Sequence, residues 1–447
     1  MNRPIPLFCA ALLAAFPAAA PAQTSAPAVP AFDFPSGAAG TLVRAAVTAV
    51  NDADSAAVDR FAAGTVSPRA RHGAEVRELL HALRRQGGTF RPGATDPWAG
   101  GRIVQELWSE RVGNGAAVLV TPDPQDTTRL LDLQFLKTLR PAAVVRELPR
   151  VRLADAALTA AIAGEVERLA AADEFSGVVL VARGGDVLYE AAFGTADPAT
   201  GARITPATRF NLASLPKMWT AVAIGQLVES GRLSLDATIG EVLPEQPWTA
   251  QARGVTIAQL LSHVGGFGML FDRPGYERAP GYRTSTELLR YFAAEPLRRA
   301  PGTRWAYSNE GFEVLGAVVE KLGGTTFAAY LDEHLLRPAG MESAWIAPPA
   351  DTVTHRAVPL PVQEGDYLGT RPRVARRLGV VGSGAGGAHG TARDVFRFAR
   401  ALATGRLVSR ATRDTFTAAR QPLAADFGAD YAYGFWTRRE NGRTVLS

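Results

Sequence analysis

The feature that most constrains this chain is an apolar helical segment that follows Ser214. Apolar side chains recur at three- and four-residue spacing as far as Gly231, which predicts one helix over that stretch. Pro216 fits the first turn, because the first amides of a helix have no partner within it. Positions three apart share a helix face, so Lys217 is expected beside Ser214. The residues that carry the pattern are Trp219, Val222, Ala223, Leu227 and Val228.

Ser214 and Lys217 form an S-x-x-K motif, which has the chemistry of a nucleophile and its base. A serine hydroxyl is a weak nucleophile until a base takes its proton. A lysine serves as that base when burial or a nearby cation lowers its pKa from ~10.4 towards ~7–8. The helix N-terminus adds partial positive charge where an oxyanion would form. The motif alone leaves a structural role open, but lysine occurs only at positions 137, 217 and 321, and no other S-x-x-K exists in the chain.

A second candidate element is the loop that holds Tyr307 and Asn309, ahead of a predicted helix over 311–322. Tyr307 is the only tyrosine with an asparagine two residues later. A loop tyrosine can relay protons if a neighbouring lysine stabilises its phenolate, and an asparagine amide can hold that lysine or a substrate carbonyl. The alternative interpretation of Tyr307 is a half-buried aromatic without a chemical role.

Composition narrows the function classes. The 447 residues suffice for roughly two or three domains. The net charge of +5 is spread along the chain as arginine, which indicates a solvated surface and not a nucleic-acid face. Six histidines form no H-E-x-x-H or H-x-H pair, so we expect no metal site and no cofactor. No serine lies in G-x-S-x-G, which argues against the α/β-hydrolase elbow.

The N-terminus has the pattern of an export signal over residues 1–22. Arg3 supplies positive charge, residues 5–16 are largely apolar, and Ala20-Pro21-Ala22 fits a cleavage site. The apolar run is too short to span a bilayer. The only cysteine, Cys9, lies within this signal, so the mature chain has no disulfide or thiol chemistry. We expect a periplasmic or secreted protein, with residues 23–36 as a linker.

Residues 37–150 are predicted to form a small α+β domain, because helical patterns come first and strand patterns follow. The order resembles the nuclear-transport-factor-like (SnoaL-like) cone fold, and we expect a docking or spacer domain without chemistry. Residues 152–447 form the second predicted domain, which opens with a helix over 154–172 and a hairpin over 178–192. The patterns of the first domain predict helices over 42–51, 55–62 and 75–84, and strands over 88–91, 101–109, 116–121 and 130–136.

Further motifs follow in a fixed order along the second domain. They are Leu260-Leu261-Ser262-His263, the Tyr307-Ser308-Asn309 box with Leu315-Gly316 and Glu320, Arg337-Pro338-Ala339-Gly340-Met341, and Gly386-Gly387 with Thr391-Ala392-Arg393-Asp394. Together with the S-x-x-K helix, this set resembles the serine β-lactamase-related hydrolases. That family includes class C β-lactamases, D-alanyl-D-alanine carboxypeptidases and esterases.

The resemblance implies an α+β fold of the β-lactamase/transpeptidase type, with an antiparallel sheet flanked by helices and an all-α subdomain. It implies Ser214 as the acyl-forming nucleophile, with Lys217 and Tyr307 sharing proton transfer. Asn309 would bind substrate and orient Lys217. The implied partners are small molecules or peptides, including cell-wall peptide. His263 matches a family loop, where we expect a structural hydrogen bond beneath the site. The glycine run over 382–390 is expected to be a flexible loop.

The chain departs from the family at its C-terminal end. The family has a third box, Lys-Thr-Gly or His-x-Gly, on a strand beside the active site. Residues 433–438 and 443–446 form a predicted hairpin, and Ser447 ends the chain about where this box is expected. Thr391 is predicted to cap a helix over 392–402, so His389-Gly390-Thr391 does not replace it. We therefore expect a truncated hydrolase domain; the alternative is an impaired fragment or pseudoenzyme that binds peptidoglycan-like ligands.

Overall fold

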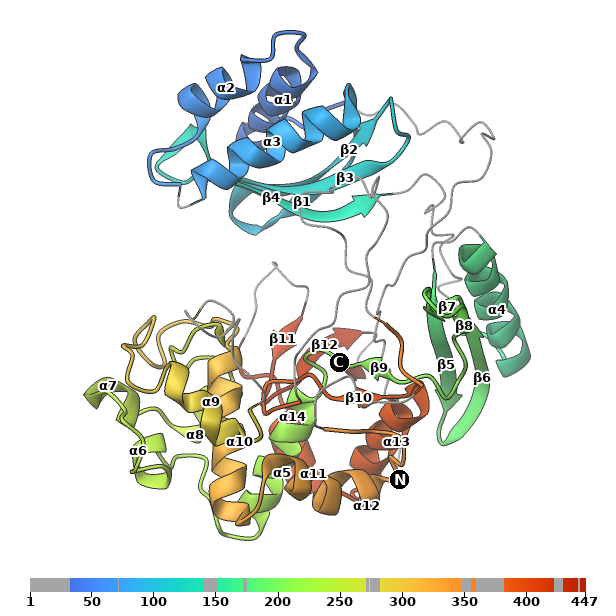
Figure 1. The fold of residues 1–447 in the computed structure, drawn as a ribbon, viewed down its shortest axis with the longest axis vertical. Coiled ribbons are helices and arrows are strands. Elements are labelled where there is room, and N and C mark those ends of the chain that lie inside the picture. Colours follow the sequence, from blue (N-terminus) through green and yellow to red (C-terminus); the bar gives the residue numbers. More distant parts are fainter. Residues whose placement is uncertain are drawn as a thin grey trace. The chain divides into compact units, whose positions relative to one another are not determined.

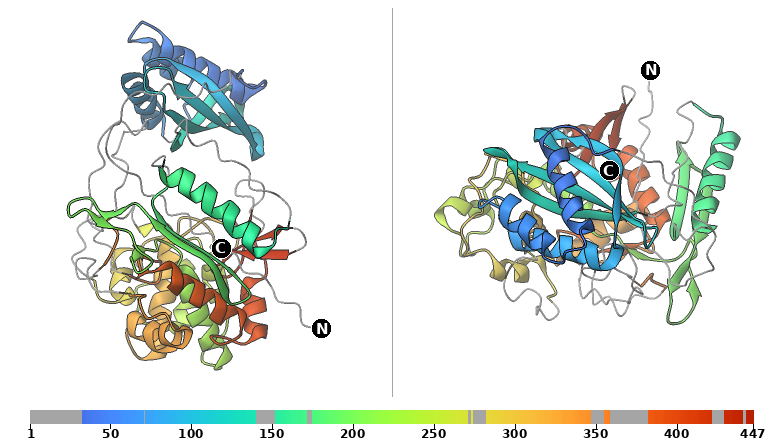
Figure 2. Two further views of the ribbon diagram at one scale, coloured as in Figure 1. Left: turned by 90° about the vertical axis from the view of Figure 1, so that its right-hand side faces the viewer. Right: turned by 90° about the horizontal axis from the view of Figure 1, so that it is seen from above.

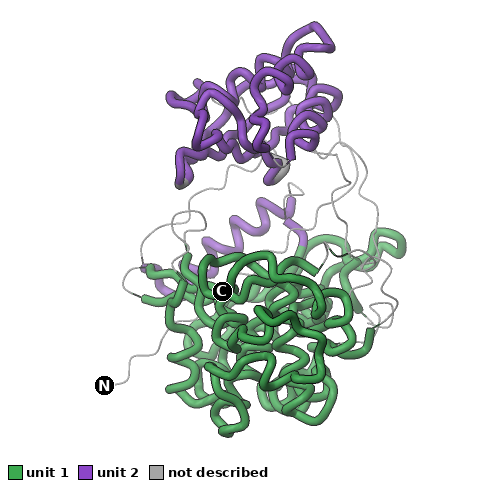
Figure 3. Tube along the Cα trace, turned by 90° about the vertical axis from the view of Figure 1, so that its left-hand side faces the viewer, with its two compact units in different colours: residues 1–14, 177–359, 377–447 green, residues 15–176, 360–376 purple. Residues whose placement is uncertain are grey.

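The computed structural model divides the chain into two compact units (Figure 3). The described residues of the N-terminal unit lie between 33 and 176, and those of the second unit lie between 177 and 447. The predicted link over 148–151 lies outside the described residues, so the predicted domain boundaries stay predictions. The structure describes residues 33–70, 72–139, 152–171, 175–270, 273, 282–346, 355–358, 382–421, 429–440 and 443–447.

The N-terminal unit packs three helices on one face of a four-stranded antiparallel sheet (Figure 1). The helices present apolar stripes to the sheet, such as Leu42, Val43 and Val47 in the first. The predicted order of helices before strands is confirmed, and the resemblance to the cone fold stays a prediction. The elements are α1 (Ala38–Asn51), α2 (Ala57–Thr65), α3 (Gly73–Gly87), β1 (Phe90–Trp98), β2 (Arg102–Ser109), β3 (Gly115–Asp123) and β4 (Asp126–Leu139), with the sheet in that order; α4 (Asp155–Ala171) follows in the chain.

Strand β1 is longer than the predicted strand over 88–91. It includes Pro92 and Pro97, which interrupt the strand pattern in the sequence. Proline has no amide hydrogen to donate, so it is tolerated where one side of the strand has no partner. Within the described ranges, strand β1 is at the edge of the sheet and pairs only with β2, with a register irregularity between Pro92 and Thr95. The edge position explains why the strand continues through both prolines.

The second unit is built around one apolar helix, α5. Its residue Trp219 has no exposed surface, and Ala221 and Leu227 are equally buried. A helix that is apolar on all sides is stable only when its neighbours cover it. Helices α10 and α14 pack against α5. The helices of this unit are α5 (Lys217–Glu229), α6 (Ile239–Val242), α7 (Ala250–Arg253), α8 (Ile257–Leu261), α9 (Ser285–Leu288), α10 (Asn309–Gly323), α11 (Phe327–Leu331), α12 (Arg337–Ala339), α13 (Ala392–Ala403) and α14 (Arg410–Thr417).

The strands of this unit form short antiparallel sets. The predicted hairpin over 178–192 is confirmed, and it packs on α13 with an ion pair between Glu190 and Arg393 (Figures 1 and 2). The C-terminal hairpin is also confirmed, but its first strand begins at Trp436 because a tight turn at Gly434 (φ 79°) precedes it. The strands are β5 (Gly177–Arg183), β6 (Asp186–Phe193), β7 (Thr195–Asp197), β8 (Ala202–Arg203), β9 (Phe210–Asn211), β10 (His389–Gly390), β11 (Asp430–Tyr431), β12 (Trp436–Glu440) and β13 (Arg443–Leu446).

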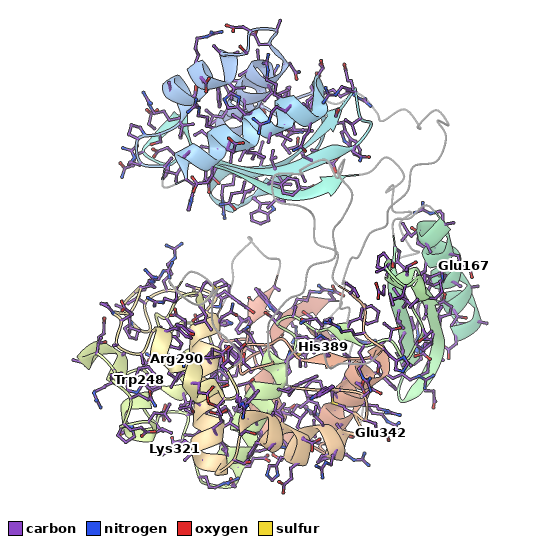
Figure 4. The ribbon with its side chains drawn as sticks, in the orientation of Figure 1. Glu167, Trp248, Arg290, Lys321, Glu342 and His389 are labelled. Carbon is purple, nitrogen blue, oxygen red and sulfur yellow. The ribbon has the colours of Figure 1, made fainter. Side chains whose placement is uncertain are left out.

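A short strand pair joins two distant segments beside α5. Phe210 and Asn211 of β9 pair with Gly390 and His389 of β10, the latter labelled in Figure 4. Thr391 then caps α13 through a reciprocal capping box with Asp394, as predicted. The pairing therefore brings the glycine run that ends at Gly390 next to the segment that leads into Ser214.

Helix α10 meets the glycine run at a point where no side chain fits. A Cβ atom on Gly316 would lie 2.4 Å from Oγ of Ser285, and one on Gly384 would lie 2.2 Å from the carbonyl oxygen of Phe312. Both distances are shorter than real Cβ contacts. The two glycines therefore allow the backbone at Gly384 to contact α10 directly.

We predict that Gly316→Ala lowers the thermal unfolding midpoint, because the added methyl group forces α9 or the glycine run away from α10. The expected loss is about 1–3 kcal/mol. Gly164→Ala is the matched control in α4, where a Cβ meets nothing within 4 Å. That change should stabilise its helix by up to about 1 kcal/mol. Calorimetry of both variants checks the prediction, and an unchanged midpoint for Gly316→Ala would contradict it.

Candidate active site

Ser214 lies in the turn that connects β9 to α5, with its side chain exposed. Its carbonyl oxygen accepts a hydrogen bond from the amide of Lys217 at 3.0 Å, and α5 begins at Lys217. Ala213, the residue before the serine, has a positive φ of 48°. Its carbonyl oxygen accepts from the amide of Gly387 at 2.8 Å. The turn that presents Ser214 at the helix N-terminus is thus held by the glycine run.

The amine of Lys217 is buried among oxygen atoms. The residue is 2% exposed, and its Nζ donates to Oδ1 of Asn309 at 2.8 Å. Nζ also lies 3.3 Å from Oγ of Ser214 and donates to the carbonyl oxygen of Ala385. Burial lowers the pKa of Lys217 from its ordinary value to about 7, although the charge of Glu313 acts in the opposite direction. The structure thus brings Ser214, Lys217 and Asn309 together.

Tyr307 completes the group of four residues that the sequence singled out. Nζ of Lys217 lies 4.8 Å from the centroid of its half-buried ring. Burial raises the pKa of Tyr307, and a hydrogen bond with Ser214 partly offsets this. The phenol is therefore neutral at pH 7 in this environment. Of the two candidate bases, Lys217 is the one whose pKa lies near neutrality.

Helix α10 places Asn309. The helix begins at Asn309, two residues before the predicted start, because Ser308 is its N-cap and accepts from the amide of Gly311 at 2.9 Å. The next residue, Glu310, is fully buried and forms an ion pair with Arg273. Oε2 of Glu310 also accepts from the amide of Gly268 at 2.7 Å. The start of α10 is thus fixed on both sides of Asn309.

His263 has the structural role that was expected. Its Nδ1 accepts a hydrogen bond from the amide of Ser308 at 3.1 Å, and its ring lies 4.5 Å from that of Tyr307. Burial and the charge of Lys217 hold its pKa well below the ordinary value. His263 is 2% exposed, and its backbone has a positive φ of 57°. His263 therefore supports the loop of Tyr307 as a neutral group.

The glycine run differs from the flexible loop that was expected. Ser383 and Gly386 exchange backbone hydrogen bonds at 2.8 and 3.1 Å, so the run forms a tight turn. The carbonyl oxygen of Gly384 accepts from Oγ1 of Thr220 at 2.7 Å. Ala385, between these residues, provides the carbonyl that binds Lys217. Glycine was interpreted as flexibility, but here it allows close backbone contact.

Sequence reasoning missed a buried carboxyl group, that of Glu313. It is 2% exposed and lies one helical turn after Asn309. Its Oε1 accepts from Oγ of Ser383 at 2.6 Å. Burial raises the pKa of Glu313 to about 7. The available signal was a charged residue four positions after Asn309, on the same helix face.

Neither a metal cluster nor a membrane span is found in the described part of the chain. No group of three or more His, Cys, Asp or Glu side chains there is arranged to hold an ion. None of the helices in the described ranges is long and apolar enough to cross a bilayer.

Comparison with known proteins agrees with this geometry. The family model described as Beta-lactamase matches residues 162–446, more than half of the chain. The chain belongs to the beta-lactamase family. Among solved structures of similar fold is a penicillin-binding protein from Bacillus halodurans. It has a TM-score of 0.55 and 28% identity, over 62% of this chain and 84% of that one. The predicted α+β fold of the β-lactamase and transpeptidase type is confirmed.

Curated members of the beta-lactamase family include esterases and penicillin-binding proteins. The esterase EstB of Burkholderia gladioli is 35% identical over 254 residues, which are 50% of this chain and 64% of that protein. Penicillin-binding protein 4* of Bacillus subtilis is 28% identical over 305 residues, 62% of this chain and 64% of that protein. This chain therefore spans about two thirds of the length of these two relatives.

We predict that Lys217→Met changes stability in a pH-dependent way. Between pH 7 and ~10.4 the unfolded wild type binds a proton at Lys217 that the folded wild type has released, so its stability rises with pH. The variant lacks this dependence. Denaturation at several pH values should show the wild type gaining on the variant by at most about 1.4 kcal/mol per pH unit.

The matched control is Lys321→Met. Lys321 lies in the last turn of α10, and its side chain is 49% exposed (Figure 4). No comparable change of the stability difference with pH is expected for it. A stability difference between wild type and Lys217→Met that stays constant from pH 7 to ~10 would show that Lys217 titrates at its ordinary value.

Proposed function

We propose that this protein is a serine hydrolase that forms an acyl-enzyme on Ser214 with an amide or ester substrate. The observation that carries the proposal is the placement of Nζ of Lys217, 3.3 Å from Oγ of Ser214, with a pKa of about 7. At neutral pH about half of such an amine is free to accept a proton. Membership of the beta-lactamase family supports the same reaction class.

In the proposed acylation step, Oγ of Ser214 attacks the substrate carbonyl carbon and transfers its proton to neutral Lys217. The carbonyl oxygen becomes an oxyanion near the N-terminus of α5, where the helix dipole favours negative charge. The tetrahedral intermediate then expels an amine or alcohol, which takes a proton from the site. Water hydrolyses the acyl-enzyme, and Lys217 again serves as the base.

Tyr307 and Asn309 have different proposed roles. The phenol of Tyr307 shares a hydrogen bond with Ser214, so it can donate a proton to the leaving group and regain one from Lys217. Oδ1 of Asn309 accepts from Lys217, which leaves the amide nitrogen of the same side chain free to face a substrate carbonyl in our proposal.

The proposed substrate is a β-lactam, a D-Ala-D-Ala peptide or a small ester. It rests on the two curated relatives, one an esterase and the other a penicillin-binding protein. The N-terminal pattern supports a proposed location outside the cytoplasm, where such substrates occur. The expected truncation before the family's third motif stays a prediction.

We predict that a fluorophosphonate probe labels Ser214 covalently, because it phosphonylates a serine that a neighbouring base activates. Mass spectrometry of the labelled peptide should place the adduct on residue 214. Ser214→Ala should abolish labelling, and Lys217→Met should slow it by about 10²–10⁴-fold, the usual contribution of a general base.

Ser234→Ala is the matched control, since Ser234 is an exposed serine in the same unit whose Oγ accepts a surface turn amide. Its labelling rate should equal that of the wild type. A folded wild type that binds a penicillin reversibly without labelling would instead identify a binding protein that lacks catalysis.

A further inference from the structure

A buried carboxyl group and a buried amine lie together beneath Ser214. Glu313 and Asn309 are four residues apart on α10, so their side chains share one face of the helix. Asn309 binds Nζ of Lys217 directly, which shows that this face is directed to the amine. Glu313 acts on the charge of the same lysine. Isolated buried charges are strongly unfavourable, so a buried acid beside a buried base requires an explanation.

The carboxyl group of Glu313 also holds the turn that binds the lysine. Its Oε1 accepts from Oγ of Ser383 at 2.6 Å, and both residues are buried. Two residues later, Ala385 offers its carbonyl oxygen to Nζ of Lys217. The second carboxylate oxygen of Glu313 is buried without a hydrogen-bond partner. The acid is therefore joined to the amine through a hydroxyl group, a tight turn and a carbonyl oxygen.

We propose that Glu313 is a positioning residue for Lys217, which fixes the turn over 383–386 through Ser383 and favours the charged form of the amine. Lys217 becomes an ammonium ion when it takes the proton of Ser214. Glu313, whose pKa is about 7, is partly ionised at neutral pH, and its carboxylate form is already in place to stabilise that ion without reorganisation. This inference rests on the proposed function of Ser214 and Lys217.

Among the neighbouring groups, Glu313 is the acid whose negative charge can offset the positive charge of Lys217. From its own helix, Glu320 acts on Glu313 as a second negative charge, but its carboxylate is bound by the amides of Ser285 and Phe327. Two titratable groups lie near Lys217, and both are uncharged: His263 is a neutral imidazole and Tyr307 is a neutral phenol. The titratable and charged groups acting on the pair or on these neighbours are Glu320, His263, Tyr307 and Tyr431.

The lysine content of the chain permits a direct test that needs no enzymatic activity. Protein labelled with ¹³C at lysine Cε gives three side-chain signals, since the chain has three lysines. The variants Lys137→Arg and Lys321→Arg assign them. We expect the Lys217 signal of the wild type to titrate with a midpoint of about 7. In Glu313→Gln, which keeps an oxygen for Ser383 but loses the charge, the midpoint should move to lower pH.

Glu245→Gln is the matched control, because it removes an exposed carboxylate that lies 3.3 Å from Nζ of Lys321. It should leave the Lys217 midpoint in place. An unchanged Lys217 midpoint in folded Glu313→Gln overturns the proposal. A wild-type midpoint near the ordinary ~10.4 would contradict the base role of Lys217 on which this inference rests, even if the variant fails to fold.

Ser383→Ala separates the two parts of the proposal, because it keeps the carboxyl group, on which the backbone of Ala385 also acts, and removes the hydroxyl group that links it to the turn. We expect it to slow fluorophosphonate labelling of Ser214 by about 10–100-fold at every pH, since small displacements of a base reduce rates strongly. Glu313→Gln should instead move the acidic limb of the labelling rate to lower pH. Wild-type labelling by Ser383→Ala would remove the positioning role. If no protein labels, the proposed function fails, while the lysine titration still decides this inference.

Discussion

The burial of a single amine, Nζ of Lys217, is the constraint on which the rest of the site depends. A lysine that is 2% exposed is tolerated only if oxygen atoms surround its charged form or its pKa falls. Both conditions hold here. Asn309 and Ala385 supply acceptors from two different segments, and the pKa is lowered to about 7. The same burial that destabilises the charged lysine makes it a base at neutral pH.

Three segments must meet for this amine to be enclosed, and glycine makes the meeting possible. Helix α5 contributes Lys217, α10 contributes Asn309, and the turn over 383–386 contributes a carbonyl oxygen. The turn reaches α10 because Gly316 and Gly384 leave no side chain between the two backbones. The amide of Gly387, next to the turn, binds the carbonyl oxygen of Ala213 and so fixes the residue before the proposed nucleophile. Packing and chemistry therefore depend on the same backbone contacts.

The sequence revealed those parts of the site whose geometry is local. Ser214 and Lys217 are three residues apart at a helix start, so their proximity follows from helix geometry alone. Tyr307 and Asn309 were found because no other tyrosine in the chain has an asparagine two residues later. Ala385 was not, because it acts through its backbone oxygen, which every residue has. Strand β1 was predicted too short for a similar reason, since whether its prolines are tolerated depends on which strand becomes an edge.

One environment assigns opposite roles to the two candidate bases. Burial disfavours the charged form of any group, so it lowers the pKa of an amine and raises that of a phenol. Lys217 is almost fully buried and Tyr307 is half-buried in this site, and their pKa values move in these opposite directions. The amine therefore approaches the pH at which a base is effective, whereas the phenol retains its proton and can donate it. Burial thus favours the amine as the base and the phenol as the acid within one site.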